Sequence, residues 1–299
     1  MKQEVLRLET IEDYCNWCGF DALHPLVTVV DMGDLSKHYP SDKVNLDLYA
    51  VWLTKGSGFS VGYGLKQYKY TDCSLVCFGA GQVIQVDTQD RNSDYSVGLL
   101  FHNDLLLGTH LGKKLSRYAF FSYSSSEALH TSPGEMIQCE ALIHRIHDVL
   151  KQNGPKTDKA WLCDLIECLL DICLKCYDRQ IVIHDTGSSD ILTDFERALT
   201  QWYESGSVAR KGFPTVAEIA DTLHITPNYL GEQIKQVTGV NVRDYIKSRI
   251  ILLAKQALLA TDLPVSSIAN MFGFTYPQHF TRLFKNITGM SPAEYRRHK

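Results

Sequence analysis

Two segments in the last third of this 299-residue chain repeat one pattern, fifty residues apart. They span residues 226–245 and 276–295, align without a gap, and share Pro, Lys, Thr, Gly and Tyr at matching positions. A repeat of this length predicts one supersecondary unit that is used twice. The nature of that unit constrains the fold of the whole C-terminal third.

Each copy contains residues that mark the start and the end of a helix. Pro227 and Pro277 suit a first helical residue, whose N–H has no partner inside the helix. Gly239 and Gly289 suit the left-handed position that closes a helix. In both copies a capping residue three positions before an acid then starts another helix.

A short apolar helix is predicted upstream of each proline. Residues 216–223 and 265–272 place apolar side chains at the i, i+3, i+4, i+7 spacing of a one-faced helix. Only three or four residues link each of them to the next helix. Two short helices around such a turn form a helix-turn-helix.

The second helix of each unit has an apolar face and a polar face. The apolar faces are predicted to carry Leu230, Ile234 and Val237 in one copy and Phe280, Phe284 and Ile287 in the other. The outward positions hold amides, hydroxyls and basic groups, which pair with base edges and phosphates in a major groove. An ordinary solvated face is the alternative for one helix alone, but two matching copies favour a groove-reading role.

We therefore predict contacts with double-stranded DNA from the outward side chains at the start and along the exposed face of both helices. The candidate DNA-binding residues are Thr226, Asn228, Tyr229, Glu232, Lys235, Tyr276, Gln278, His279, Thr281, Arg282 and Lys285.

A helix over residues 242–260 is predicted between the two units. At 1.5 Å per residue it forms a rod of about 28 Å. Successive major-groove faces on one side of B-DNA lie about 34 Å apart. A stiff connector of this length predicts that both reading helices enter adjacent turns of one groove without a second chain.

The same residues resemble a known family. Val265-Ser266-Ser267-Ile268-Ala269, the run from Phe280 to Lys285, and Thr288-Gly289-Met290-Ser291-Pro292 look like the signature of AraC/XylS-type transcriptional regulators. The resemblance covers about residues 191–299. It implies a seven-helix DNA-binding domain with two helix-turn-helix units and a central helix, in a transcription activator for which RNA polymerase is a candidate partner. Gly231 and Glu232 depart from the family pattern in the first unit.

Composition and charge predict two domains with different surroundings. The apolar content of 44% is that of a globular protein, and the sequence has neither a leader nor an apolar run of membrane-spanning length. We therefore expect a cytoplasmic protein without a membrane partner. Residues 191–299 carry a net charge of +4 and residues 1–190 carry −8, which together give the −4 of the chain. A basic end and an acidic end suit one domain on DNA and another held away from it.

The N-terminal half reads as short strands, which makes the predicted fold class α+β. The clearest strands are residues 27–30, 47–53, 59–63, 74–78, 83–86 and 96–101. Strands at this spacing predict a small barrel or jelly roll. The turn from Phe78 to Gln82 resembles that of the cupin-like sensor domain common in the family.

The sequence favours sensing over catalysis in this half. Cupin metal sites use a His-x-His pair, and none occurs here. We accordingly predict no catalytic residue, no metal, no cofactor and no enzyme activity, and a small-molecule effector of unknown identity. Tyr49, Trp52, Phe59 and Tyr63 are inward-pointing candidates that suit a plain core equally well.

Nine cysteines raise the question of a zinc or redox site. Cys15 and Cys18, like Cys173 and Cys176, have ligand-like spacing. Cys73 and Cys77 fall in a predicted strand, about 13 Å apart, which is too far for one tetrahedral ion. Most of these cysteines are expected to be small apolar core residues, with a redox-sensing pair as the minor alternative.

Two helices are predicted after the strands, over residues 133–152 and 158–179. In the second, Leu162, Leu165, Leu169, Ile172 and Cys176 follow the alternating three-four spacing of a coiled-coil seam. This seam either joins two chains or packs on the barrel, and we expect a homodimer. The predicted organisation is a sensor domain over residues 1–180 with dimerisation helices at about 133–179, a linker over 181–190, and the DNA-binding domain over 191–299.

The leading hypothesis is thus a ligand-responsive transcription regulator. One alternative is an alkyl-transfer DNA-repair protein that uses reactive cysteines next to a similar DNA-binding domain. Another is a ligandless regulator that a partner protein controls. The residues leave open the effector, the operator, the target genes and the sign of regulation.

Overall fold

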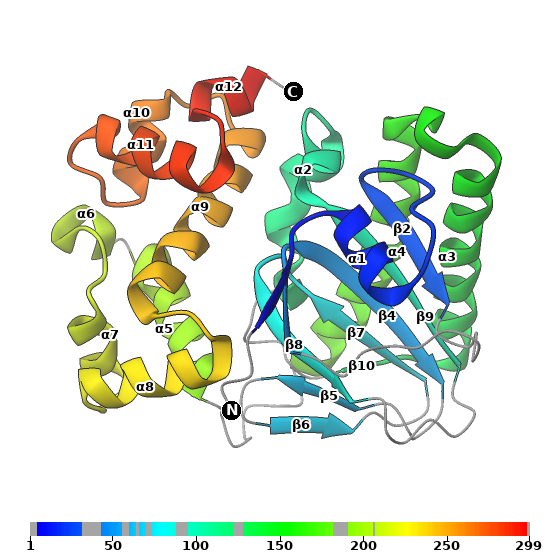
Figure 1. Cartoon of the computed structure of the whole chain (residues 1–299), viewed down its shortest axis with the longest axis horizontal. Helices are drawn as coiled ribbons and strands as arrows, with labels where there is room; N and C mark the ends of the chain where they lie inside the picture. The colour runs from blue at the N-terminus through cyan, green and yellow to red at the C-terminus, as the bar shows by residue number, and fades with distance from the viewer. Residues whose placement is uncertain are drawn as a thin grey trace. The chain divides into compact units, whose positions relative to one another are not determined.

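The computed structural model describes residues 5–31, 43–55, 60–63, 66–69, 73–87, 95–121, 128–181, 191–205 and 207–297. The chain divides into two compact units, a mixed α+β unit and a helical one (Figure 1). Unit 1 comprises Met1–Leu105 and Tyr118–Ser188, and unit 2 comprises Leu106–Arg117 and Ser189–Lys299. Most of the predicted linker, residues 182–190, lies outside the described residues.

Unit 1 contains two five-stranded sheets. The first has the order β1 (Leu6–Leu8), β3 (Lys43–Leu46), β8 (Gln82–Asp87), β5 (Ser60–Tyr63) and β6 (Lys66–Lys69). The second has the order β10 (Leu129–His130), β7 (Ser74–Phe78), β4 (Leu48–Lys55), β9 (Tyr95–His102) and β2 (Val27–Asp31). Neighbouring strands are antiparallel except for β1 and β3. The turn from Phe78 to Gln82 therefore carries the chain from one sheet to the other.

Six predicted strands correspond to β2, β4, β5, β7, β8 and β9, within one or two residues at each end. Strands β1, β3, β6 and β10 were not predicted, because they are two to four residues long and too short for a visible alternation. Helix α1 (Ile11–Cys18) was not predicted either, although a capping box between Thr10 and Asp13 marks its start. Cys73 lies just before β7 with a φ of 63°, so its predicted place inside a strand was wrong.

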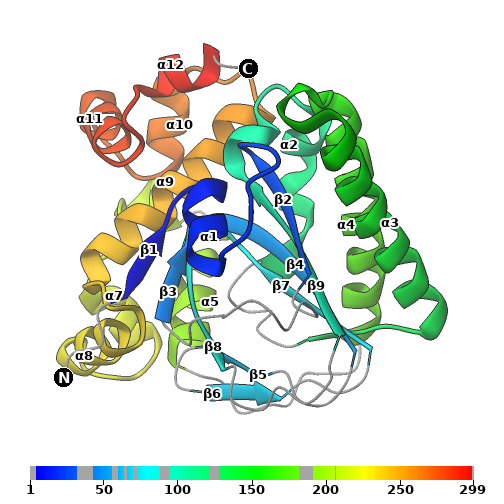
Figure 2. The same ribbon diagram turned by 45° about the vertical axis from the view of Figure 1, so that its right-hand side comes forward.

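Two long helices, α3 (Pro133–Asn153) and α4 (Lys159–Ile181), lie side by side along the β7–β4–β9–β2 sheet (Figure 2). The unit itself buries the face of α4 that carries Leu162, Ile166, Leu169, Cys173 and Cys176. Three residues of the predicted dimer seam are in this set. These three residues pack inside the unit, because a three-four apolar spacing is equally that of a helix packed on its own domain, whereas Leu165 and Ile172 of the seam are only half-buried.

Alternate residues of β4 face opposite sides of the sheet. Tyr49 lies on the side of the helices, where its ring is 5.2 Å from that of Phe101 and 5.0 Å from that of Phe121. Trp52 lies on the other side and covers Gly98, where an added Cβ would be 2.6 Å from the indole ring. Phe59 and the side chain of Tyr63, the other two predicted inward-pointing residues, lie outside the described residues.

Short helical elements complete this half of the sequence. They are η1 (Asn103–Leu106), α2 (His110–Lys114), η2 (Leu115–Arg117), η3 (Ala119–Phe121) and η5 (Gly154–Lys156). Among the described helices, none has the length and apolar content that a membrane crossing requires. In the same part of the chain, His, Cys, Asp and Glu side chains do not gather in threes in a way that could hold a metal ion.

Residues 191–297 form eight helices in the described part of the chain, one more than the seven that the resemblance implies. They are α5 (Ile191–Glu204), α6 (Ser207–Lys211), α7 (Val216–Thr222), α8 (Pro227–Thr238), α9 (Val242–Ala260), α10 (Val265–Met271), α11 (Pro277–Thr288) and α12 (Pro292–Arg297). The addition is α6, which is only five residues long.

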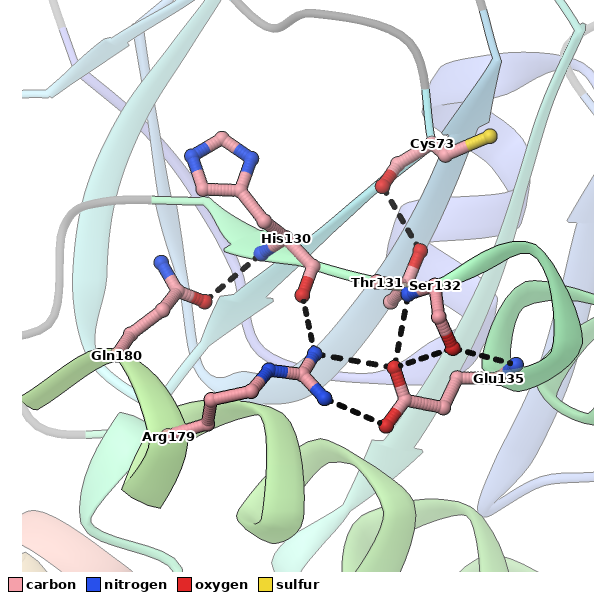
Figure 3. A network of polar contacts seen from close by, with 7 residues as sticks. All are labelled: Cys73, His130, Thr131, Ser132, Glu135, Arg179 and Gln180. Atoms are coloured by element: carbon pink, nitrogen blue, oxygen red, sulfur yellow. Dashed lines mark hydrogen bonds and ion pairs between the residues drawn. The ribbon is translucent and has the colours of Figure 1, made fainter.

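Polar contacts hold the last turn of α4 to its own unit (Figure 3). The Arg179 guanidinium donates to the two carboxylate oxygens of Glu135, at 2.9 and 3.0 Å, and to the carbonyl of His130 at 2.9 Å. The Gln180 amide accepts from the His130 N–H at 2.8 Å and donates to the Ala128 carbonyl at 3.1 Å. Since β10 is an edge strand, these two side chains cover backbone groups that would otherwise lack partners.

The same carboxylate starts α3. Glu135 accepts from the N–H and the hydroxyl of Ser132, at 2.8 and 2.9 Å, and so completes a capping box. Mainly because Arg179 and Ser132 hydrogen-bond to its ionised form, the pKa of Glu135 falls to about 2. We call this set, made of Glu135, Arg179 and Gln180, the α4 clasp.

The clasp predicts a pH dependence with a definite sign. A folded-state pKa of about 2, below the ordinary value of 4.5, means that the clasp's contribution is complete above about pH 4.5 and is lost as the pH falls towards 2. Glu135→Gln keeps an oxygen for the Ser132 N–H but removes the charge. We expect urea unfolding midpoints of this variant to fall less than those of the wild type between about pH 7 and about pH 3.

Lys55→Met is the matched control. It removes another ion pair of α3, in which the Lys55 Nζ lies 2.7 Å from Glu140, and leaves the clasp intact. This variant should keep the wild-type dependence below pH 4.5. An unchanged acid dependence in Glu135→Gln would show that other carboxylates cause it.

Candidate nucleic-acid interface

The predicted repeat corresponds to two helix pairs, α7 with α8 and α10 with α11, and the members of each pair contact each other. Each turn contains a left-handed residue at the same place, two positions after the first helix: His224 with a φ of 56° and Gly273 with a φ of 82°. At Gly273 a side chain is excluded by space as well, since an added Cβ would lie 2.8 Å from the backbone of Gly212 and Phe213. Histidine is among the residues that tolerate this conformation.

The second helix of each pair begins and ends as predicted. Pro227 and Pro277 are at the start, while Gly239 and Gly289 close the helices with φ values of 72° and 79°. The two starts differ in one respect. The Thr226 hydroxyl accepts from the N–H of Tyr229 at 3.2 Å, which caps α8, whereas Tyr276 makes no side-chain cap on α11. Instead its ring lies edge-on to that of His279, 5.6 Å away.

The inward faces of α8 and α11 are packed. Leu230, Ile234, Phe280 and Phe284 have no exposed surface, and Val237 is also buried. Ile287, predicted on the same apolar face, is 37% exposed, so the structure buries two of the three side chains predicted for that face of α11. These buried side chains fix the opposite faces outward.

Ten of the eleven predicted DNA-contacting residues are exposed. Thr226, Asn228, Tyr229, Glu232, Lys235, Tyr276, Gln278, His279, Arg282 and Lys285 all have exposed side chains. Thr281 is half-buried. Within the described part of the chain, Asn228, Lys235, Gln278 and Arg282 pair with no other side chain, so their donors are available to a ligand. Each helix thus presents one polar surface with basic groups.

Both helix pairs are attached to α9, which contacts α8, α10, α11 and α12 (Figure 1). Its 19 residues span about 28 Å. Asn241 caps its start by accepting from the Asp244 N–H at 3.0 Å, and Asp244 pairs with Lys247 at 2.8 Å. The helices α8 and α11 lie towards opposite ends of α9 (Figure 1).

A buried ion pair fixes α5 on α9, and the sequence reading missed it. Glu196 is 1% exposed, and a carboxylate oxygen lies 3.2 Å from the Nε of Arg249. Burial raises the pKa of Glu196, while the charge of Arg249 and the hydroxyl of Tyr245 oppose that rise. One feature of the sequence could have predicted this pair: Glu196 lies on the apolar stripe of α5, between Phe195 and Leu199.

Two short helix pairs with polar outward surfaces are the arrangement that helix-turn-helix DNA-binding proteins use. A family model described as a helix-turn-helix domain matches residues 219–298. The Transposon Tn10 TetD protein of Escherichia coli is 34% identical over 122 residues, which cover 41% of this chain and 79% of TetD. The arabinose operon regulatory protein of E. coli strain K12 is 31% identical over 94 residues, which cover 31% of this chain.

Among solved structures, the C-terminal domain of AraT, a response regulator from Geobacillus stearothermophilus, is similar with 29% identity and a TM-score of 0.31. The match covers 36% of this chain and 85% of that domain. The chain spans about a third, 32%, of the arabinose operon regulatory protein.

The chain belongs to the AraC family of helix-turn-helix transcription regulators. Its C-terminal helical domain is that of a DNA-binding transcription regulator.

The Glu196–Arg249 pair predicts a large effect on stability. Glu196→Ala leaves the Arg249 charge largely buried without its carboxylate, which we expect to lower the free energy of unfolding by about 3 kcal/mol. Asp194→Ala, which removes an exposed pair of α5 with Arg197, should change it by less than about 1 kcal/mol. Denaturant unfolding measures both, and equal effects would contradict the assignment.

Proposed function

We propose that the protein reads two successive turns of one major groove, with α8 in one turn and α11 in the next. The helix pairs α7–α8 and α10–α11 then serve as two helix-turn-helix units. The observation that carries this proposal is the placement of two exposed polar helix faces on one connector about 28 Å long. That length is close to the separation of adjacent groove faces.

The side chains divide by chemistry into two roles. Asn228, Gln278 and Arg282 suit base edges, because an amide pairs with adenine and a guanidinium with guanine. Lys235 and Lys285 suit phosphates, as does the ring-and-imidazole pair at the start of α11. Glu232 accepts from a cytosine amino group or is only tolerated near the backbone, and Thr226, Tyr229 and Thr281 complete the contact set.

Arg282→Ala tests the proposal most directly. It should weaken binding to a duplex selected from a random pool by about 1–3 kcal/mol and leave non-specific binding nearly unchanged. Arg197→Ala, an exposed arginine on α5, is the control and should bind as the wild type does. Fluorescence anisotropy at several salt concentrations provides the measurement.

Two results would reject the assignment. Wild-type protein without any salt-dependent duplex binding would remove the DNA-reading proposal altogether. Equal losses of specific and non-specific affinity in Arg282→Ala would make this residue a phosphate contact.

We also propose that residues 1–180 form a cupin-like sensor domain and that residues 181–190 link it to the DNA-binding domain. Two five-stranded sheets, antiparallel except for the β1–β3 pair, and a turn that passes between them support this interpretation. The side of β4 turned away from α3 and α4 is the proposed effector site. Trp52 covers Gly98 there, and Ser96 is on the neighbouring strand, opposite Thr54.

Ser96 supplies a buried hydroxyl group to the proposed site. Its side chain is 3% exposed, and the hydroxyl has no hydrogen-bond partner among the described residues. A buried hydroxyl without a partner is unfavourable, and a ligand with a polar group would satisfy it. The proposed effector is therefore a small, largely apolar molecule with a hydrogen-bonding group.

Thermal unfolding with a panel of sugars, organic acids and aromatic metabolites tests this site. A true effector should stabilise the wild type by about 2.7 kcal/mol at a concentration about 100 times its Kd. Ser96→Ala should keep the stability of the free protein, since it removes a group without a partner, and should lose most of the ligand effect. A ligand that stabilises the variant equally binds elsewhere.

A homodimer through the outer surface of α3 and α4 is the proposed assembly, with RNA polymerase as a further partner. Apolar side chains remain exposed or half-exposed there, although the buried stripe of α4 is occupied. They are Ile137, Trp161, Leu165, Cys168 and Ile172. Two chains would double the number of half-sites that one complex contacts.

A further inference from the structure

Gly231 is a glycine in the interior of α8, and nothing in the fold requires it. It is the fifth residue of α8 and lies eight residues before Gly239, in an uninterrupted helix. Its backbone is not in the left-handed region that favours glycine, unlike that of Gly239 or Gly289. Backbone strain therefore does not explain this residue.

Packing does not explain it either. A Cβ added at Gly231 would meet no heavy atom within 4 Å among the described residues. At Gly273, by contrast, the added atom would lie 2.8 Å from neighbouring backbone. The space beside Gly231 is open, so the folded unit would accept alanine there.

Glycine at such a position weakens a helix. It loses more backbone entropy on folding than alanine does and ranks near the bottom of helix propensities. An interior glycine without a left-handed backbone or a close neighbour thus makes α8 less stable than alanine would. The reason for it has to be sought outside the folded chain.

The position of Gly231 indicates that reason. It follows Asn228 by three residues and precedes Lys235 by four, so it lies beside both of these exposed residues on the helix surface. The matching residue of α11 is Thr281, and both positions are half-buried, at the margin of the polar surface. Both helices have a small residue at this margin, and α8 has the smallest one possible.

We infer that Gly231 is a positioning residue for DNA: the missing side chain lets the α8 backbone come close to the groove, which brings Asn228 and Lys235 within hydrogen-bond reach. This inference rests on the proposed placement of α8 in the major groove. A methyl group at this point would hold the helix away by its own radius. Hydrogen bonds weaken steeply with such a displacement.

Gly231→Ala separates stability from binding. We expect the variant to have a Tm about 2–4 °C higher than the wild type, because alanine strengthens the helix. Its affinity for the selected duplex should fall at least about tenfold, and that of Gly231→Leu further. A higher Tm together with weaker binding excludes misfolding as the cause.

Gly134→Ala is the matched control. Gly134 is also a helical glycine whose added Cβ would meet nothing within 4 Å, but it lies in α3 of unit 1. This variant should bind DNA as the wild type does. Hydroxyl-radical footprinting should further show that Gly231→Ala loses protection in the half-site of α8 and keeps it in the half-site that Arg282 contacts.

Unchanged affinity in both Gly231 variants would overturn the inference, and so would an equal loss in Gly134→Ala. Failure of the underlying proposal looks different. In that case the wild type itself would show no specific binding that Arg282→Ala reduces.

Discussion

The packing of α9 against both helix pairs is the constraint on which the DNA-binding unit depends. Ile246, Ile250 and Leu258 are buried along this helix, so its neighbours are held by apolar surface rather than by flexible linkers. Burial of such side chains is the dominant favourable contribution to folding. It fixes α8 and α11 at opposite ends of a connector of set length. The distance between the two polar surfaces is therefore set by buried apolar side chains that belong to neither surface.

Charged groups have a different role in each unit. The Glu196–Arg249 pair is buried, where an ion pair is costly to break and specifies how α5 meets α9. The α4 clasp is partly exposed and satisfies the open backbone groups of an edge strand. Its position matters because α4 is the last element of unit 1 before the chain continues to unit 2. Cys176 is the last buried residue of that helix among the described side chains, and the polar contacts of the clasp hold the last turn.

Two residues of the DNA-binding unit are less favourable for the stability of the fold than another residue type would be. His224 occupies a left-handed position that glycine fills in the second pair, and Gly231 occupies a helical position that alanine would fill better. The side chain of His224 is exposed, and an added Cβ at Gly231 would meet nothing within 4 Å among the described residues. Both are in or next to the exposed helix face, which agrees with the general observation that local rules are broken mostly at functional sites.

The sequence by itself determined the local features: the two helix pairs, the bounds of α8, α9 and α11, and the outward set that contains Arg282 and Lys235. These features depend on prolines, glycines and caps acting over one or two helical turns, which a linear pattern records. Only the tertiary structure decided that Leu162 and Leu169 face their own core, that Tyr49 and Trp52 lie on opposite sides of β4, and that Glu196 meets Arg249. Those outcomes depend on residues far apart in the chain. Whether a side chain is buried or paired is determined by the element that packs against it, and the sequence of one helix or strand does not reveal which element that is.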